Sequence, residues 1–63
     1  MRCKLKDIRK EQGWTQKWLA QQIGVSDKTM SEIITEKSVP TLQTAIRIAK
    51  VVGVPVEGIW TED

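Results

Sequence analysis

The sequence predicts a small all-α domain built from five short helices. Three observations support this prediction. The chain has 63 residues, which is the length of a single domain. Residues that begin and end helices divide it into five segments whose apolar side chains have helical spacing. No segment alternates apolar and polar residues in the way that a half-buried strand does.

The helix boundaries each have a local cause. Gly13, Gly24 and Gly53 follow apolar helical segments, and glycine readily adopts the left-handed conformation that ends a helix. Thr15 and Ser26 precede such segments, where a hydroxyl accepts a hydrogen bond from an unpaired backbone amide. The five helices are therefore expected at about residues 4–12, 16–23, 27–34, 41–52 and 54–60.

The buried faces follow from the spacing of apolar residues three and four positions apart. In the second and third helices the predicted core residues are Leu19, Ala20, Ile23, Met30, Ile33 and Ile34. In the fourth helix the predicted inward residues are Leu42, Ala45, Ile46, Ala49 and Val52. Trp18 lies off the buried stripe of its helix, so we expect it to be at least half exposed.

The composition favours a binding protein over an enzyme. The chain has no histidine and one cysteine, so it lacks the usual acid–base side chain and the ligands of a structural zinc site. Its four glycines are far apart and form no phosphate-binding loop. We therefore expect no catalytic residue, no metal and no cofactor. The lone Cys3, which we expect at a frayed terminus, favours a reducing compartment, hence the cytoplasm, and no apolar run approaches the ~18 residues that span a membrane.

The charge is unevenly distributed along the chain. The formal net charge is +2, but residues 1–17 carry six basic and two acidic side chains, a sum of +4. A basic segment on a nearly neutral protein favours an anionic partner.

The most informative stretch is residues 16–34, where two short helices are joined by a tight turn. Ala20 is small enough to let the two helices approach, and Gly24 begins the turn. This is the helix-turn-helix arrangement, in which the second helix enters the major groove of DNA.

The same residues resemble a known family, the lambda repressor and Cro type of helix-turn-helix protein, called the XRE family. The resemblance runs from about Leu5 to Trp60. It is carried by Thr15-Gln16-x-x-Leu19-Ala20-x-x-Ile23-Gly24-Val25-Ser26-x-x-Thr29-Met30-Ser31, by Pro40-Thr41-Leu42-x-Thr44-Ala45-x-x-Ile48-Ala49 and by Gly53-Val54-Pro55-Val56-Glu57-Gly58-Ile59-Trp60.

The resemblance implies a sequence-specific, double-stranded DNA-binding transcriptional regulator, a repressor that acts as a homodimer on a pseudo-palindromic operator. The positions that match base-reading residues are Ser26, Asp27, Lys28, Ser31 and Glu32. Those that match phosphate contacts are Gln16, Lys17, Thr29 and Lys37. By its chemistry Lys28 can donate to O6 and N7 of guanine, and Asp27 or Glu32 can accept from N4 of cytosine.

Three positions depart from the family pattern. The outward face of the third helix sums to −1, from Asp27, Lys28 and Glu32, which disfavours binding near phosphates. Thr35-Glu36 stands where the family commonly has Asn-Gly, so we expect the third helix to end differently. Gly58 replaces an acidic helix former and is expected to loosen the last helical turn.

The whole chain, residues 1–63, is thus expected to be one DNA-binding domain with a dimerisation segment at about residues 51–60. The predicted interface residues are Val51, Val54, Val56, Ile59 and Trp60. The alternative is an antitoxin or other protein-binding module on the same fold, which the acidic outward face and Trp18 favour.

Overall fold

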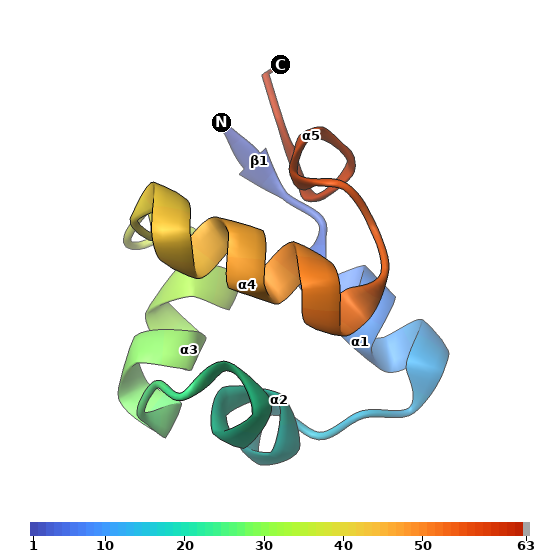
Figure 1. The fold of residues 1–63 in the computed structure, drawn as a ribbon, viewed down its shortest axis with the longest axis vertical. Coiled ribbons are helices and arrows are strands. Elements are labelled where there is room, and N and C mark those ends of the chain that lie inside the picture. The colour runs from blue at the N-terminus through green and yellow to red at the C-terminus, as the bar shows by residue number, and fades with distance from the viewer. Residues whose placement is uncertain (63) are drawn as a thin grey trace.

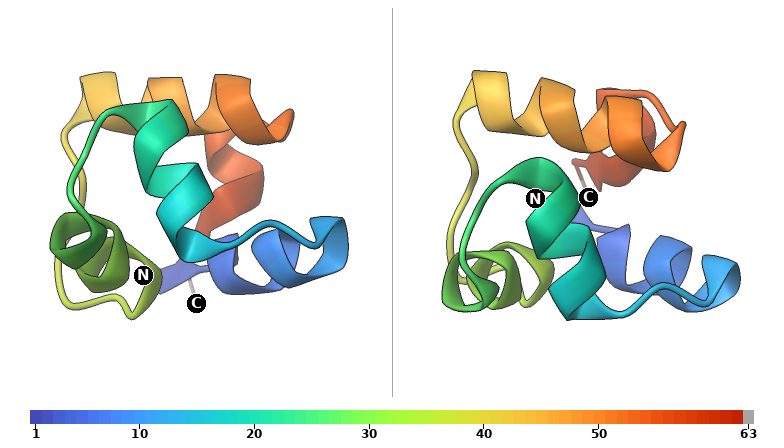
Figure 2. Two further views of the ribbon diagram at one scale, coloured as in Figure 1. Left: turned by 90° about the horizontal axis from the view of Figure 1, so that it is seen from below. Right: turned by 60° about the horizontal axis from the view of Figure 1, so that its bottom comes forward.

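The computed structural model describes residues 1–62, which form five helices (Figure 1) and a two-stranded antiparallel sheet. The all-α, five-helix prediction is confirmed, with the small sheet as an addition. In chain order the elements are β1 (Arg2–Cys3), α1 (Leu5–Gln12), α2 (Gln16–Ile23), α3 (Asp27–Ile34), α4 (Leu42–Val52), α5 (Val56–Ile59) and β2 (Trp60–Thr61). α4 packs against α2 and α5, on the opposite side of the molecule from α1 (Figure 2). No helix among these residues has the length and apolar character to cross a membrane.

The predicted caps and terminating glycines are confirmed by their hydrogen bonds and backbone angles, whereas the fifth helix is shorter than the predicted 54–60 and spans only Val56–Ile59. The hydroxyls of Thr15 and Ser26 accept hydrogen bonds from the amides of Trp18 and Thr29, at 3.0 and 3.1 Å. The glycines that end α1, α2 and α4 have positive φ, of 75° at Gly13, 86° at Gly24 and 75° at Gly53.

The inward face of α4 differs from the prediction. Ile48 is fully buried, whereas Leu42 and Ile46 are 73% and 43% exposed. Two apolar stripes run along α4, and periodicity alone does not decide between them. The stripe of Ala45, Ile48 and Val52 is buried because it faces the helices against which α4 packs. The predicted cores of α2 and α3 are confirmed in full.

The two short strands were not predicted from the sequence. Cys3 pairs with Trp60, and Arg2 with Thr61, in antiparallel register. The amide of Lys4 continues this pairing with a 2.8 Å hydrogen bond to the carbonyl oxygen of Ile59. Strands of two residues are too short to show alternation. As a result, Cys3 lies in a paired strand rather than at a frayed end, and Trp60 follows the last helix rather than belonging to it.

The end of α3 is closed by a non-glycine residue in the left-handed conformation. Glu36 has a φ of 67°, which a side chain disfavours, so α3 ends without the glycine that closes α1, α2 and α4. The two amides that follow it, of Lys37 and Ser38, both donate to the carbonyl oxygen of Glu32, at 2.9 and 3.2 Å. These bonds offset the strain of the left-handed residue.

Gly58 has a role that its low helix propensity does not suggest. A Cβ atom at this position would lie 2.9 Å from Cγ1 of Val54, which is closer than side chains pack. The absence of a side chain therefore lets Val54 pack directly over α5. Gly58 permits close packing in this turn, in addition to its cost in helix propensity.

Candidate nucleic-acid interface

The centre of the candidate interface is the pair α2 and α3, two helices of eight residues each. The turn between them is tight. The amides of Gly24 and Val25 both donate to the carbonyl oxygen of Ala20, at 2.9 and 3.1 Å. Ala20 is only 1% exposed, so the crossing of the two helices leaves no space for a larger side chain.

The buried face of α3 determines which side of this helix meets solvent. Met30, Ile33 and Ile34 lie in the hydrophobic core. The opposite side carries the predicted base-reading residues. Of these, Ser26, Asp27 and Lys28 are exposed, and Ser31 and Glu32 are partly exposed.

The hydroxyl of Ser26 is already engaged within the helix terminus. Its oxygen accepts from the amide of Thr29, and its proton is donated to Oγ1 of Thr29 at 3.0 Å. Asp27, Lys28 and Glu32 have no such side-chain hydrogen bond among the described residues, so their charged groups face solvent.

The predicted phosphate-contacting residues flank this surface. Lys17, Thr29 and Lys37 are exposed, and Lys37 extends from the loop that follows α3. Gln16 is partly buried at the start of α2, and its Nε2 donates a long 3.4 Å hydrogen bond to the carbonyl oxygen of Asp27. Gln16 therefore joins the first residues of the two helices.

Two contacts beside this unit were not foreseen from the sequence. Arg47 of α4 donates from Nη1 to the carbonyl oxygen of Ile23, the last residue of α2, at 3.2 Å. Trp14 and Trp18 form a ring pair, with centroids 5.1 Å apart and planes tilted by 30°. Trp18 is 37% exposed, less than the half expected from the sequence, because its ring packs against that of Trp14. The first contact joins residues 24 positions apart, and no sequence spacing signals it.

The residues of the predicted dimerisation segment are not equally available to a partner. Ile59 is fully buried in the core, because its side chain closes the space beneath α5, so it cannot contact a second chain directly. Val51, Val54, Val56 and Trp60 are partly buried.

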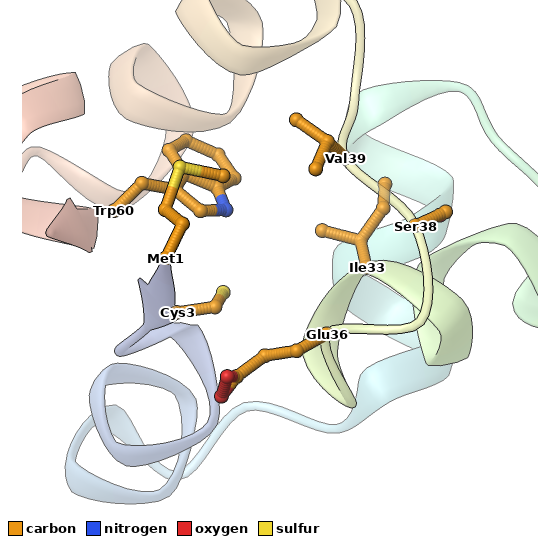
Figure 3. A pocket seen from close by; sticks show the side chains of 7 residues that line it. All are labelled: Met1, Cys3, Ile33, Glu36, Ser38, Val39 and Trp60. Atoms are coloured by element: carbon orange, nitrogen blue, oxygen red, sulfur yellow. The ribbon is translucent and has the colours of Figure 1, made fainter. Parts of the chain in front are cut away.

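Beside β1 and β2 lies a small cavity of about 190 Å³, lined by Met1, Cys3, Ile33, Glu36, Ser38, Val39 and Trp60 (Figure 3). Burial raises the pKa of the Cys3 thiol, and the negative charge of Glu36 raises it further. A thiol with a raised pKa is a poor nucleophile near neutral pH. Within residues 1–62, no group of three His, Cys, Asp or Glu side chains is placed to hold a metal ion.

Comparison with known proteins agrees with this geometry. A family model described as helix-turn-helix matches residues 5–59. An uncharacterized HTH-type transcriptional regulator of Methanocaldococcus jannaschii, MJ0272, is 42% identical over 60 residues, which are 95% of this chain and 91% of that protein. A second uncharacterized HTH-type transcriptional regulator, YgzD of Bacillus subtilis, is 31% identical over 64 residues, with coverage of 100% and 97%.

Proposed function

The chain belongs to the XRE-type helix-turn-helix family of DNA-binding transcriptional regulators, and we propose that it is a sequence-specific repressor that binds its operator as a homodimer. The observation that carries this proposal is the α2–α3 unit. Its crossing is closed at Ala20, its buried face is anchored in the core, and the polar side of α3 is free. An exposed helix held in this way can enter the major groove.

In this proposal α3 reads bases. Lys28 donates to O6 and N7 of a guanine, and Asp27 or Glu32 accepts from N4 of a cytosine. Because two of these three side chains are acidic, the preferred site has cytosines opposite them. A duplex without these donors is repelled.

The DNA backbone is held beside α3. The N-terminal amides of α2 face the phosphates, as helix N-termini commonly do. Gln16, Lys17, Thr29 and Lys37 add side-chain donors, and these contacts orient the protein without selecting a sequence. Gln16 is the link between the two roles, since its amide also contacts the backbone of α3.

A homodimer follows from how little DNA one helix can read. A single recognition helix covers only a few base pairs, and a protomer of charge +2 has little sequence-independent electrostatic attraction to DNA. Two copies place two helices in successive major grooves, about 34 Å apart on one side of a pseudo-palindromic site. A dimer bound to such a site inside a promoter excludes other proteins from it, and the repression that we propose acts in this way.

The test is selection of bound sequences from random duplex DNA with the purified protein, followed by affinity measurements at several salt concentrations. We expect enrichment of a pseudo-palindrome. With about 6–10 phosphate contacts per dimer, affinity should fall by about 10³–10⁵ between 50 and 200 mM salt. An absence of enrichment, or affinity that does not change with salt, would contradict DNA reading. Enrichment of a single unrepeated half-site would contradict the homodimer alone.

A further inference from the structure

The carbonyl oxygen of Ile23 lies at the C-terminal end of α2, where the last carbonyl groups of a helix have no partner within the helix. The amides of Gly24 and Val25, which follow it, donate to Ala20 instead. Ile23 therefore accepts no backbone hydrogen bond in the described part of the chain, and Nη1 of Arg47 on α4 donates to it at 3.2 Å. Figure 2 shows this end of α2 against α4, and the turn that runs from it to α3.

The guanidinium of Arg47 also lies against the first residue of the turn. A Cβ atom on Gly24 would be 3.8 Å from Nη1 of Arg47, which is ordinary van der Waals contact. The positive charge thus sits where α2 ends and the turn begins, at the negative end of the α2 dipole.

One other hydrogen bond ties the start of α3 to its surroundings. It runs from Nε2 of Gln16 to the carbonyl oxygen of Asp27, and it is longer, at 3.4 Å, and exposed to solvent. The bond of Arg47 is shorter and partly buried. Since a hydrogen bond gains strength when it is shorter and shielded from water, the bond of Arg47 is the stronger tie.

Arg47 acts at the point where the direction of α3 is decided. Only three residues lie between the anchored carbonyl group of Ile23 and Asp27, where α3 begins. The buried side of α3 fixes the rotation of this helix about its own axis. The position of its N-terminal end, which carries Asp27 and Lys28, depends on the turn as well. Hydrogen bonds to base edges require donor–acceptor distances of about 2.7–3.2 Å, so a displacement of about 1 Å removes them.

We propose that Arg47 is a positioning residue for base reading. It contacts no DNA. By holding the end of α2 against α4, it sets the direction in which α3 leaves the turn, and so directs Asp27 and Lys28 toward base edges. This inference rests on the proposed function and adds to it a residue outside the α2–α3 unit. Arg47 therefore acts on the preference for one sequence over others, and not on the general affinity for duplex DNA.

A direct contact between Arg47 and phosphate is the competing explanation for an arginine on this surface. Arg47 lines a shallow depression of about 240 Å³ together with Gln43, Ile46 and Lys50. Lys50 is exposed, as Arg47 is, and carries the same charge. If this face of α4 bound phosphate, Lys50 would contribute as Arg47 does. The pair of cations therefore separates the two explanations.

Duplex binding by the wild type, Arg47→Met, Arg47→Lys and Lys50→Met tests the proposal. The measured quantity is the ratio of two affinities, one for the selected site and one for random duplex. We expect Arg47→Met to lower this ratio about 10-fold, which is the effect of one lost base contact, and to leave the affinity for random duplex and its salt dependence unchanged. Arg47→Lys keeps a charged donor and should recover part of the ratio. Lys50→Met is the matched control, since it removes the same charge from the same face of α4, and should change the ratio less than twofold.

A second control separates positioning from a loss of stability. Thr41→Ala removes the hydroxyl that accepts from the amide of Thr44 at the start of α4, at 3.2 Å, and leaves the bond between Arg47 and Ile23 in place. Affinities are measured at a temperature at which circular dichroism finds every variant folded. Under these conditions Thr41→Ala should keep the wild-type ratio, whereas Arg47→Met should not.

The orientation of α3 can also be measured without DNA, from residual dipolar couplings of the backbone amides of α3 and α4. Arg47→Met should change the couplings of α3 relative to those of α4, and Lys50→Met should leave them unchanged. If Arg47→Met weakens selected and random duplex by the same factor, the proposal is wrong and Arg47 contacts phosphate. Couplings of α3 that Arg47→Met does not change would also overturn it. A wild type without sequence preference would reject the proposed function instead, and the couplings would then decide whether Arg47 orients α3.

Discussion

Arg47 donates a 3.2 Å hydrogen bond from its guanidinium Nη1 to the carbonyl oxygen of Ile23, the residue that ends α2. The bond places a positive charge at the negative end of the α2 dipole and attaches that end to α4. Gly24 follows at once, so the anchored point is the start of the turn that leads to α3. The orientation of α3 thus depends partly on a residue outside the α2–α3 unit.

We predict that Arg47→Met lowers the free energy of unfolding by about 0.5–1.5 kcal/mol, the usual net value of one hydrogen bond. Methionine keeps most of the aliphatic chain and removes only the donor and the charge. Arg47→Lys keeps the positive charge, so its free energy of unfolding should fall by less than that of Arg47→Met. Urea denaturation of the three proteins measures the differences. Equal stability of the wild type and Arg47→Met would show that the bond contributes nothing in solution.

A second prediction concerns Glu36, whose φ of 67° is unfavourable for any residue with a side chain. Glu36→Gly removes the carboxylate and relieves the backbone strain. Glu36→Ala also removes the carboxylate, but its side chain leaves the strain in place. Glu36→Gly should be more stable than Glu36→Ala by about 1 kcal/mol. For a domain of this size that difference corresponds to about 4–8 °C in the midpoint of thermal unfolding. Identical midpoints for the two variants would mean that the loop after α3 relaxes when the carboxylate is lost.

The sequence was most informative where structure is determined within a few residues. The caps at Thr15 and Ser26, and the glycines after α1 and α2, depend on local backbone geometry and were predicted correctly. On α4 the sequence predicted Leu42 as buried and missed Ile48, whereas the structure buries Ile48 and exposes Leu42. The choice between the two apolar stripes of α4 depends on where α2 and α5 lie. The sheet was missed for the same reason, since Cys3 and Trp60 are far apart in sequence and pair only after the helices have packed.

In the candidate site, too, locally determined features were predicted and features that depend on tertiary packing were not. The outward position of Lys28 followed from the spacing of buried residues on α3 and from the family resemblance. The contact of Arg47 with the end of α2 did not, because it depends on the tertiary arrangement of α4. Gln16 was assigned to phosphate, and only the structure places its amide next to the carbonyl oxygen of Asp27.

A third prediction follows from the raised pKa of Cys3, which burial of the thiol causes. The folded protein holds this proton to higher pH than the unfolded chain does. The resulting stability is complete below the ordinary thiol pKa, about 8.5, and is lost as the pH rises above it. Cys3→Ser has no thiol to titrate. Between pH 7 and pH 10 the wild type should lose more unfolding free energy than Cys3→Ser, as urea denaturation at each pH can measure. Parallel losses in both proteins would contradict a raised pKa of the Cys3 thiol.

The last prediction separates base reading from phosphate contact on the proposed DNA surface. Lys28→Ala and Glu32→Ala should change which bases are preferred, each at a cost of about 1–3 kcal/mol on the best site, because each removes one partner of a specific base edge. Lys17→Ala should weaken every duplex alike, since phosphate contacts do not depend on sequence, and should reduce the salt dependence by about one phosphate. Gln16→Ala should also weaken binding to every duplex. Gln16→Glu should weaken this binding further, because the introduced carboxylate repels phosphate and cannot donate to the carbonyl oxygen of Asp27.

Binding selections with each variant measure base preference, and titrations of a fixed duplex measure affinity. If Lys28→Ala and Glu32→Ala scale all affinities by one factor, α3 does not read bases through these side chains. If Glu32→Ala instead tightens binding to every duplex, Glu32 acts only as a repulsive charge near the phosphates, and the reading of cytosine falls to Asp27.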